Sequence, residues 1–354
     1  MVEKQVKVWF LRGLKQWNKS SNNRKMPWKG ENDPYKIWLS EIILQQTRVE
    51  QGWDYYLRFI QAYPTVQSLS QASDNEVFKL WEGLGYYSRC RNLLHTARVV
   101  ANQRKGKFPD TQEGLLSLKG IGNYTAAAIG SFAFGLPLAV VDGNVHRVLS
   151  RVLGIREPVD TAKGKKRMEE LAESLLDKQN PAQHNQAMMD LGATVCLPRN
   201  PNCTQCPFTK KCIACTTGTV GDFPVKSKKI NVRHRFFYYL MLEYRNRLLV
   251  RQRENGDVWS QLHEFILKET DEPKELEEIN RSSFWGMRYA KNDWQIMDQS
   301  EPIVHVLSHQ RINARIIHVR IKHPLQLKGY TWMSKEQIDQ LAFPRLITRY
   351  RQSR

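Results

Sequence analysis

The stretch LKGIGNYTAAAIGSFAFG, Leu118 to Gly135, decides the fold of the first part of this chain. It predicts a short helix ending at Leu118, a tight turn at Gly120-Ile121-Gly122 and a second helix from Asn123, because glycines adopt backbone angles that other residues avoid. Backbone N–H groups at the start of the second helix would point outward, where they can hold a DNA phosphate without reading sequence. Alone, a Gly-x-Gly turn is weak evidence, since any helix-turn-helix corner can contain one.

The segment that follows, LPLAVVDGNVHRVLSRVLG from Leu136 to Gly154, strengthens this interpretation. An apolar, strand-like run ends at Asp142, and an amphipathic helix is predicted from Asn144 onward. Asp142 therefore lies near a helix N-terminus, which favours the ionised form of its carboxyl group.

The rest of the chain divides into two parts. Residues 1–215 are predicted to be mainly helical, because apolar residues recur at helical spacing between turns that contain proline. Residues 216–230 are rich in Gly, Thr, Pro and Lys and are predicted to form a linker. Residues 231–354 hold aromatic and β-branched runs with partial alternation, which predict a smaller α+β domain.

Charge and length narrow the class of protein. The 354 residues include 54 Lys and Arg against 35 Asp and Glu, a formal net charge of +19. A field of that sign attracts polyanions, of which nucleic acid is the commonest in a cell, although a basic surface can also serve solubility alone. No apolar run of 18 residues exists and the N-terminus is charged, so we expect a soluble intracellular protein with two domains.

Four of the six cysteines form a compact motif. Cys196, Cys203, Cys206 and Cys212 stand at the spacing Cys-x6-Cys-x2-Cys-x5-Cys. Four thiolates in such a loop can converge on one centre, which favours an iron–sulfur cluster, whereas a zinc site usually has two closely spaced pairs. The other two cysteines, at 90 and 215, have no role that the sequence assigns.

The stretch WLSEIILQQT, from 38 to 47, contains one carboxylate, Glu41, and no cation. Its neighbours three and four residues away on a helix are apolar or neutral. Burial without a cationic partner raises the pKa of a carboxyl group and keeps its proton near neutral pH. Taken alone, Glu41 could equally be a polar residue of the core.

In this order, WLSEIILQQT, GLGYYSR, LKGIGNYTAAAI, VVDGN and the cysteine motif resemble the helix-hairpin-helix DNA glycosylase superfamily, specifically the adenine glycosylase (MutY) family. The resemblance covers essentially the whole chain. It implies that Glu41 is the acid that protonates adenine N7 and that Asp142 stabilises or traps the sugar cation. It also implies that Tyr124 and Asn144 position the acid, the sugar or water. One [4Fe-4S] cluster would be bound by Cys196, Cys203, Cys206 and Cys212.

One position separates this chain from endonuclease III-like relatives. Those enzymes carry a lysine nucleophile just after the hairpin glycines, where this chain has Tyr124. A monofunctional glycosylase is therefore expected. Two alternatives stay open at this point: an endonuclease III-like glycosylase acting on oxidised pyrimidines, and a non-catalytic iron–sulfur protein that binds lesions.

The resemblance also implies contacts to DNA and to the extruded base. Gln46 and Tyr86 would probe and wedge beside the opposing base, and Gly120 and Gly122 would hold the backbone. The adenine pocket would be lined by Arg24, Met26, Trp28 and Gln186. Around this pocket the chain departs from the common family pattern at two positions, with Lys29 in place of arginine and Gln186 where some members have glutamate.

The C-terminal domain resembles the Nudix-like domain with which this family recognises 8-oxoguanine. No Arg-Glu-x-x-Glu-Glu cluster follows GDVWSQLHEF, residues 256–265, so recognition rather than hydrolysis is expected. Leu307, Ser308 and His309 would contact the lesion, with Leu307 in place of the family's phenylalanine.

The expected partner is double-stranded DNA with adenine opposite 8-oxoguanine or guanine. The protein is expected to act as a monomer with no membrane contact, and a sliding-clamp contact is open. It would act in the cytoplasm beside the nucleoid if the source is bacterial, and in the nucleus or mitochondrion if eukaryotic.

Overall fold

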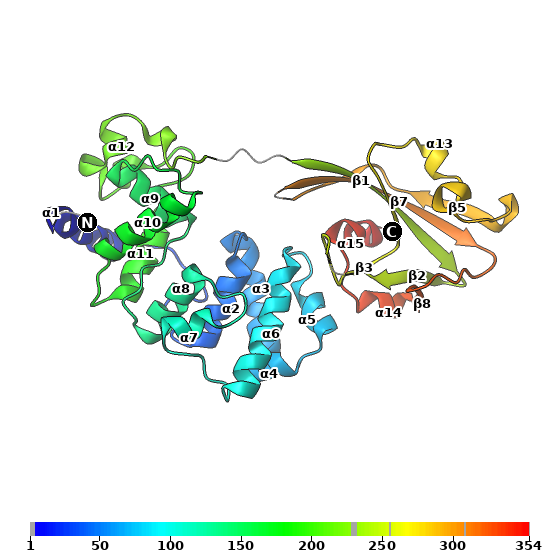
Figure 1. The fold of residues 1–354 in the computed structure, drawn as a ribbon, viewed down its shortest axis with the longest axis horizontal. Coiled ribbons are helices and arrows are strands. Elements are labelled where there is room, and N and C mark those ends of the chain that lie inside the picture. Colours follow the sequence, from blue (N-terminus) through cyan, green and yellow to red (C-terminus); the bar gives the residue numbers. More distant parts are fainter. Residues whose placement is uncertain (1–3, 228–231, 255, 308, 354) are drawn as a thin grey trace. The chain divides into compact units, whose positions relative to one another are not determined.

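A computed structural model describes residues 4–227, 232–254, 256–307 and 309–353 (Figure 1). The chain forms two compact units, one made of residues 1–71 and 91–228 and the other of residues 72–90 and 229–354. Each unit is described by itself. The domain boundaries expected from the sequence, with a linker at 216–230, stay a prediction.

The first unit is helical, as expected. Its helices, with the two that pass through the 72–90 segment, are α1 (Lys4–Ser20), α2 (Pro34–Leu44), α3 (Val49–Ala62), α4 (Val66–Gln71), α5 (Asp74–Trp81), α6 (Tyr87–Gln103), α7 (Gln112–Leu116), α8 (Asn123–Phe134), α9 (Gly143–Leu153), α10 (Ala162–Leu175), α11 (Pro181–Thr194) and α12 (Ile213–Thr216). Within the described ranges, no helix combines the length and apolar character needed to cross a lipid bilayer.

Helix α2 is buried on nearly every side, and this sets the environment of Glu41. Eight of its residues are buried: Tyr35 and the seven from Ile37 to Ile43. A helix that is apolar all round belongs inside a core rather than at a surface. It packs against α3 and α8, so the carboxyl group of Glu41 projects from a helix that is largely shielded from water.

The glycine turn between α7 and α8 has the predicted hairpin form. Gly120 has φ +83°, and a Cβ atom there would lie 2.8 Å from Cβ of Asn92. Both the angle and the close approach require glycine. Helix α8 begins at Asn123 as predicted, while α7 ends at Leu116, two residues before the predicted end.

The strand predicted before Asp142 is wrong. Residues 136–142 belong to no helix or strand among the described residues, and the N–H of Leu138 donates to the carbonyl of Leu136 over 2.8 Å. The buried side chain of Asn185 replaces a neighbouring strand: its Nδ2 donates to the carbonyl of Leu138 over 2.8 Å, and its Oδ1 accepts from the N–H of Val140 over 3.1 Å. One amide side chain thereby satisfies the backbone that a sheet would otherwise pair.

The second unit is built around a mixed sheet, and its α+β class is as predicted. Its strands are β1 (Arg233–Tyr244), β2 (Arg247–Gln252), β3 (His263–Glu264), β4 (Ile266–Thr270), β5 (Trp294–Gln299), β6 (Ile303–Val306), β7 (Gln310–Ile321) and β8 (Thr331–Ser334). The main path runs β3-β2-β1-β7-β5, with β1 and β7 parallel. Helices α13 (Leu276–Ile279), α14 (Lys335–Asp339) and α15 (Arg345–Gln352) complete the unit. Figure 1 shows β1 and β7 side by side at the centre of this sheet.

Candidate active site

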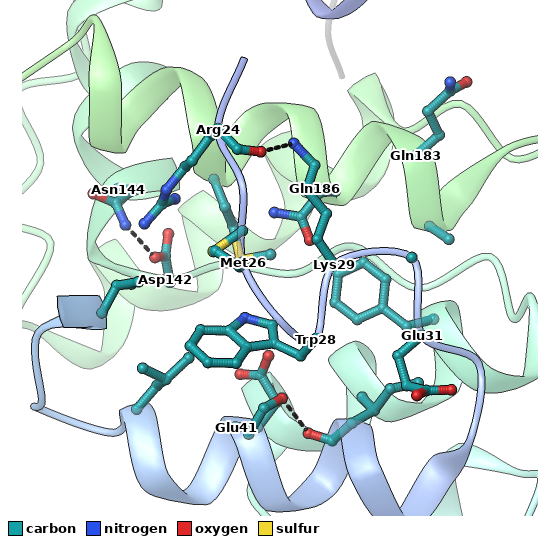
Figure 2. Close-up of a pocket in the computed structure, with 18 of the residues that line it drawn as sticks. Arg24, Met26, Trp28, Lys29, Glu31, Glu41, Asp142, Asn144, Gln183 and Gln186 are labelled. Atoms are coloured by element: carbon teal, nitrogen blue, oxygen red, sulfur yellow. Dashed lines mark hydrogen bonds between the residues drawn. The ribbon is translucent and has the colours of Figure 1, made fainter. Parts of the chain in front are cut away.

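One cavity of about 520 Å³ in the first unit brings together most of the predicted catalytic and pocket residues. Its volume falls within the range of about 300–1,000 Å³ that is typical of small-molecule sites. Its lining includes all four predicted catalytic residues, Glu41, Tyr124, Asp142 and Asn144, and all four predicted base-pocket residues, Arg24, Met26, Trp28 and Gln186. Figure 2 shows Glu41 and Asp142 turned toward the same space, with Trp28 beside them.

The environment of Glu41 raises the pKa of its carboxyl group, so that the protonated form is available near neutral pH. Only 6% of the residue is exposed. Burial raises the pKa of its carboxyl group to about 7; the hydrogen bond from Tyr124 works against this, and the charge of Asp142 adds to it. The phenol of Tyr124 donates to Oε2 of Glu41 over 2.5 Å. Burial beside Glu41 raises the pKa of Tyr124 well above its ordinary value, so Tyr124 remains a proton donor in this bond.

Asp142 caps the helix that follows it. Its Oδ1 accepts from the N–H of Val145 over 2.8 Å, and its Oδ2 accepts from Nδ2 of Asn144 over 2.6 Å. The carboxylate thus lies at the positive end of α9 and holds two donors that stabilise negative charge. A carboxylate fixed in this way suits a site where positive charge develops.

Arg147 joins the Asp142 side of the cavity to the cysteine loop. Its Nη2 donates to Oδ1 of Asn144 over 2.7 Å, and its Nε donates to the carbonyl of Cys196 over 2.6 Å. Its Nη2 also donates to the carbonyl of Gly192 over 2.7 Å. A Cβ at Gly192 would lie 2.5 Å from Cβ of Asn144, so glycine is needed there. Asn144 is therefore fixed from both sides.

Asp190 organises the base-pocket wall, and the sequence analysis missed it. The side chain is fully buried and accepts from Asn22, Arg24, Lys29 and Gln186 over 2.8 to 3.0 Å. Lys29 also donates to the carbonyl of Arg24 over 2.9 Å, as Figure 2 shows. Lys29 thus holds the loop that carries it through two hydrogen bonds, without the planar guanidinium group of the arginine in the common pattern. A carboxylate in the apolar run MMDLG, four residues after Gln186, was the available signal.

Replacing Asp190 with asparagine should destabilise the first unit. Arg24 and Lys29 would lose their shared anion, but both are partly exposed and regain water, so we expect a loss of about 1–3 kcal/mol in the free energy of unfolding. Urea unfolding measures this. The control is Glu173→Gln, which removes an exposed ion pair with Lys178 and should change stability by less than about 0.5 kcal/mol. Equal stability of the two variants would contradict the anchoring role.

Two residues predicted to contact DNA share an unusual backbone conformation. Gln46 has φ +57° and Tyr86 has φ +47°. Both side chains are exposed, Tyr86 by 43%, and the guanidinium of Arg89 lies 5.6 Å from the centroid of the Tyr86 ring. Residues other than glycine adopt such angles rarely, and they gather at functional sites. Gly122 is the N-cap of α8, with no atom within 4 Å of a Cβ placed there, so its backbone is open to a phosphate.

The four motif cysteines line a single small cavity beside α9 and α11. Among the described residues, no three His, Cys, Asp or Glu side chains lie close enough to bind one metal ion. A zinc ion needs its sulfur ligands about 3.8 Å apart, given Zn–S bonds of about 2.3 Å in a tetrahedron. The four motif cysteines and Cys215 share this cavity with Arg151.

One side of this cysteine cavity is lined by Arg151. The guanidinium of Arg151 donates to Sγ of Cys196 over 3.4 Å and to the carbonyl of Leu197 over 2.7 Å, while the thiol of Cys212 donates to the carbonyl of Arg151 over 3.3 Å. One cation with its N–H donors therefore lies against the Cys196 side of the cavity. Burial raises the pKa values of the Cys203, Cys206 and Cys212 thiols.

In the second unit, the predicted lesion-contacting segment is held at both ends. The N–H of Leu307 donates to the carbonyl of Gln310 over 2.8 Å, and the N–H of Arg233 donates to the carbonyl of His309 over 2.9 Å. The Arg235 guanidinium donates to the side chain of Gln310 over 3.0 Å. His309 is exposed. Ser308 lies outside the described residues.

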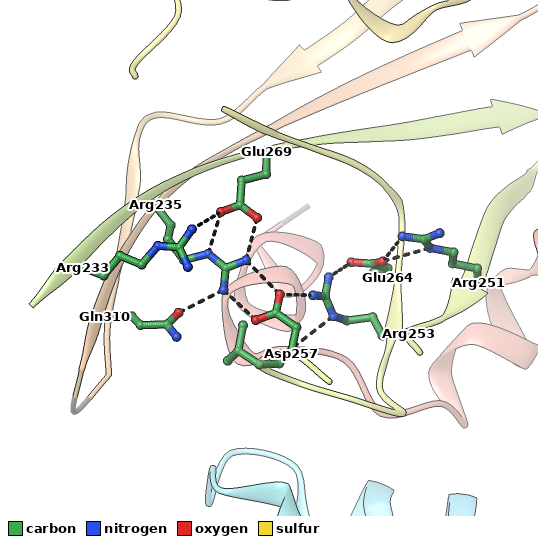
Figure 3. Close-up of polar contacts among 9 residues, drawn as sticks. Arg233, Arg235, Arg251, Arg253, Asp257, Glu264, Glu269 and Gln310 are labelled. Atoms are coloured by element: carbon green, nitrogen blue, oxygen red, sulfur yellow. Dashed lines mark hydrogen bonds and ion pairs between the residues drawn. The ribbon is translucent and has the colours of Figure 1, made fainter. Parts of the chain in front are cut away.

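The acids near residues 256–265 are paired with arginines, as Figure 3 shows. Asp257 pairs with Arg235 over 2.7 Å and with Arg253 over 3.0 Å. The fully buried Glu264 pairs with Arg253 and with Arg251. The bond to Arg235 lowers the pKa of Asp257 despite partial burial. Carboxylates neutralised by guanidinium groups are poor ligands for Mg²⁺ on a diphosphate. That the second unit recognises and does not hydrolyse stays a prediction.

Two family models match the chain. Residues 39–178 match the HhH-GPD superfamily base excision DNA repair protein, and residues 237–353 match the NUDIX domain. The first match contains the glycine hairpin, Glu41 and Asp142. The second covers the sheet of the second unit.

Curated relatives span bacteria, plants and mammals. An adenine DNA glycosylase of Buchnera aphidicola (subsp. Schizaphis graminum) is 34% identical over 72% of this chain and 73% of its own length. The adenine DNA glycosylase of Arabidopsis thaliana is 34% identical over 90% of this chain and 58% of its own length. The human adenine DNA glycosylase is 43% identical over 58% of this chain and 39% of its own length.

Solved structures agree on the helical fold. A thermostable thymine-DNA glycosylase superposes with a TM-score of 0.56 at 30% identity, covering 60% of this chain and 98% of that one. A trapped endonuclease III–DNA covalent intermediate gives a TM-score of 0.53 at 20% identity, covering 62% of this chain and 99% of that one. The second likeness shows the fold alone.

Proposed function

Because the chain belongs to the adenine DNA glycosylase family, we propose that it removes adenine mispaired with 8-oxoguanine or guanine by hydrolysing the N-glycosidic bond. The observation that carries this proposal is the pairing of two carboxyl groups in one cavity. Glu41, buried, has a pKa of about 7, while Asp142 accepts two hydrogen bonds at the start of α9. Base excision repair of DNA follows as the setting.

The two carboxyl groups divide the chemistry. Glu41, protonated near neutral pH, donates a proton to N7 of the extruded adenine and makes the base a better leaving group. Positive charge then develops on the deoxyribose, and the carboxylate of Asp142 stabilises it or traps it transiently until water completes hydrolysis. Asn144 orients Asp142 through its 2.6 Å hydrogen bond.

Tyr124 tunes the acid, and this gives a pH prediction. The Tyr124 hydrogen bond lowers the pKa of Glu41 against the larger effect of burial, so Tyr124→Phe should raise that pKa further. Base release needs the protonated acid and falls as pH rises through its pKa, near 7 in the unaltered protein. The variant should therefore keep its activity to higher pH. Single-turnover rates from pH 5 to 9 measure the midpoint.

The control for this prediction is Tyr55→Phe on α3. Its ring contacts Arg58 and does not line the cavity, so its profile should match that of the unaltered protein. A midpoint that stays in place or moves to lower pH in Tyr124→Phe would contradict the tuning role.

We propose that the enzyme is monofunctional and leaves the strand intact. Tyr124 stands where a lysine nucleophile would form a Schiff base and its phenol is engaged with Glu41. The test is single-turnover base release from a duplex with one adenine opposite 8-oxoguanine, followed by alkali. Strand breaks that need alkali are expected. Strand breaks without alkali, or borohydride trapping on a duplex with an oxidised pyrimidine, would favour an endonuclease III-like activity. Tight binding of the duplex without release of adenine would favour a non-catalytic lesion-binding protein.

The second unit is proposed to recognise 8-oxoguanine. Leu307, Ser308 and His309 would meet the lesion, with leucine acting as a wedge and polar groups bonding the altered base edge. The support is the connection between β6 and β7, in which His309 is exposed and the backbones of Leu307 and His309 are bonded to β7 and β1. The guanidinium of Arg235 donates to the side chain of Gln310, the first residue of β7, and so helps to fix the end of this connection. The partner is then duplex DNA, bound by a monomer whose net charge of +19 favours phosphate contacts.

We propose that Cys196, Cys203, Cys206 and Cys212 hold one [4Fe-4S] cluster. When bound, the cluster would supply four iron–thiolate bonds that fix the loop. Hydrogen bonds connect this loop to the catalytic residues. Arg147 donates to the carbonyl of Cys196 and to the side chain of Asn144, and Asn144 donates to the carboxylate of Asp142. Iron and sulfide content of the purified protein tests the assignment.

A further inference from the structure

A fifth cysteine lines the cavity of the four motif cysteines. Cys215 lies on α12, three residues after Cys212, and its side chain faces the same space as the others. The family spacing accounts for four thiols and leaves this one without a role. Cys90, the sixth, is fully buried elsewhere, with its thiol near the carbonyl of Val77, so Cys215 alone is an extra thiol within reach of the cavity among the described residues.

Cys215 is directed at one particular neighbour. Burial and the neighbouring Cys215 side chain raise the pKa of the Cys203 thiol, so Cys215 lies beside Cys203, and the backbone N–H of Cys215 donates to the carbonyl of Cys212 over 3.1 Å. Cys203 is partly exposed on the short η1 turn (Cys203–Gln205). Both side chains line the same cavity. Cys196, in contrast, is held by Arg151 on the other side.

The backbone keeps Cys215 at this place. Ala214 beside it is fully buried. A Cβ at Gly154 would lie 2.7 Å from Cγ2 of Ile213, so α12 packs closely against the end of α9. Cys215 also accepts from the N–H of Gly218 through its carbonyl. A thiol on a helix anchored in this way stays close to Cys203 without rearrangement of the loop.

We propose that Cys215 is a reserve ligand of the cluster that takes the place of Cys203 when the Cys203 thiolate is not available. The inference rests on the cluster proposed above. In the exchange, the bond from iron to Sγ of Cys203 breaks and a bond to Sγ of Cys215 forms. The proton of the Cys215 thiol passes to the departing Cys203 thiolate, or to solvent where Cys203 has been replaced. One thiolate replaces another, so neither iron nor sulfur is oxidised or reduced.

The experiment uses the full chain with four alanine variants, purified without oxygen. Cys203→Ala should keep more than about half of the iron of the unaltered protein, and Cys203→Ala/Cys215→Ala should keep less than about a tenth. Cys206→Ala is the matched control, because Cys215 is not among the neighbours that shift the pKa of the Cys206 thiol, and it should lose its iron. Cys215→Ala should keep its full content. The readouts are iron, acid-labile sulfide and visible absorbance per chain.

Alkylation of the folded proteins gives a second readout that needs only a small soluble yield. Iodoacetamide should label Cys215 in the unaltered protein and leave it unlabelled in Cys203→Ala, where it binds iron. The proposal is overturned if Cys203→Ala loses as much iron as Cys206→Ala, if the double variant keeps as much iron as Cys203→Ala, or if Cys215 is labelled equally in both proteins. An unaltered protein that holds no iron would overturn the cluster itself, while base release on the adenine duplex tests the glycosylase function separately.

Discussion

Glu41→Gln slows single-turnover release of adenine by about 10²–10⁴-fold, the usual contribution of a general acid. Glutamine has the same shape and can still accept the hydrogen bond from Tyr124, but its amide cannot give up a proton near neutral pH. The buried position of Glu41 makes a neutral amide well tolerated. Rapid-quench measurement of abasic sites on an adenine:8-oxoguanine duplex gives the rate.

The matched control is Glu50→Gln, an exposed residue in the first turn of α3. It should release adenine at the unaltered rate. Duplex binding by Glu41→Gln, followed by fluorescence anisotropy, should also be unchanged, because the lost proton acts in the chemical step. A Glu41→Gln protein that keeps more than about a tenth of the rate would show that another group supplies the proton.

Asp142→Asn lowers the same rate by about 10²–10³-fold, the scale seen when one electrostatic partner of a developing charge is removed. Asparagine is as good an N-cap as aspartate, so its oxygen can keep the bond to the N–H of Val145 and α9 keeps its start. The variant therefore removes charge while it preserves shape. The rate loss should persist at pH 5 and pH 8, since it does not depend on protonating Glu41.

Asp177→Asn provides the comparison for this charge change. Asp177 accepts from the N–H of Gln179 at an exposed turn, and its substitution should leave base release and thermal unfolding unchanged. If Asp142→Asn releases adenine as fast as Asp177→Asn does, the sugar cation is stabilised by another group. If it unfolds at a much lower temperature, its lost activity reflects the helix cap rather than the charge.

Local sequence was enough for the elements that depend on local chemistry. The glycines at 120 and 122 predicted the hairpin because one requires a left-handed backbone and the other opens a helix N-terminus. The Arg245-Asn246 pair, both with positive φ, forms the two-residue connection between β1 and β2. Such features need only a few adjacent residues to be specified.

Other features depended on residues far away. The run before Asp142 has strand composition, yet Asn185, 45 residues beyond Val140, satisfies its backbone. Asp190 binds Arg24 across 166 residues. No local pattern encodes either pairing. The order of charged residues in the sequence of the second unit does not predict that Glu264 is fully buried between two arginines.

The long chain separation within the cavity has a consequence for synthesis of the protein. The bond between Tyr124 and Glu41 spans 83 residues, and the Asp190 contacts close the base pocket only after α11 exists. On a nascent chain Glu41 is an ordinary solvated carboxyl group, whose pKa lies in the usual range for glutamate, and it is ionised in the cell. Its acid chemistry therefore appears only when helices from both ends of the unit have assembled, so an incomplete chain carries the residue but not the reactivity.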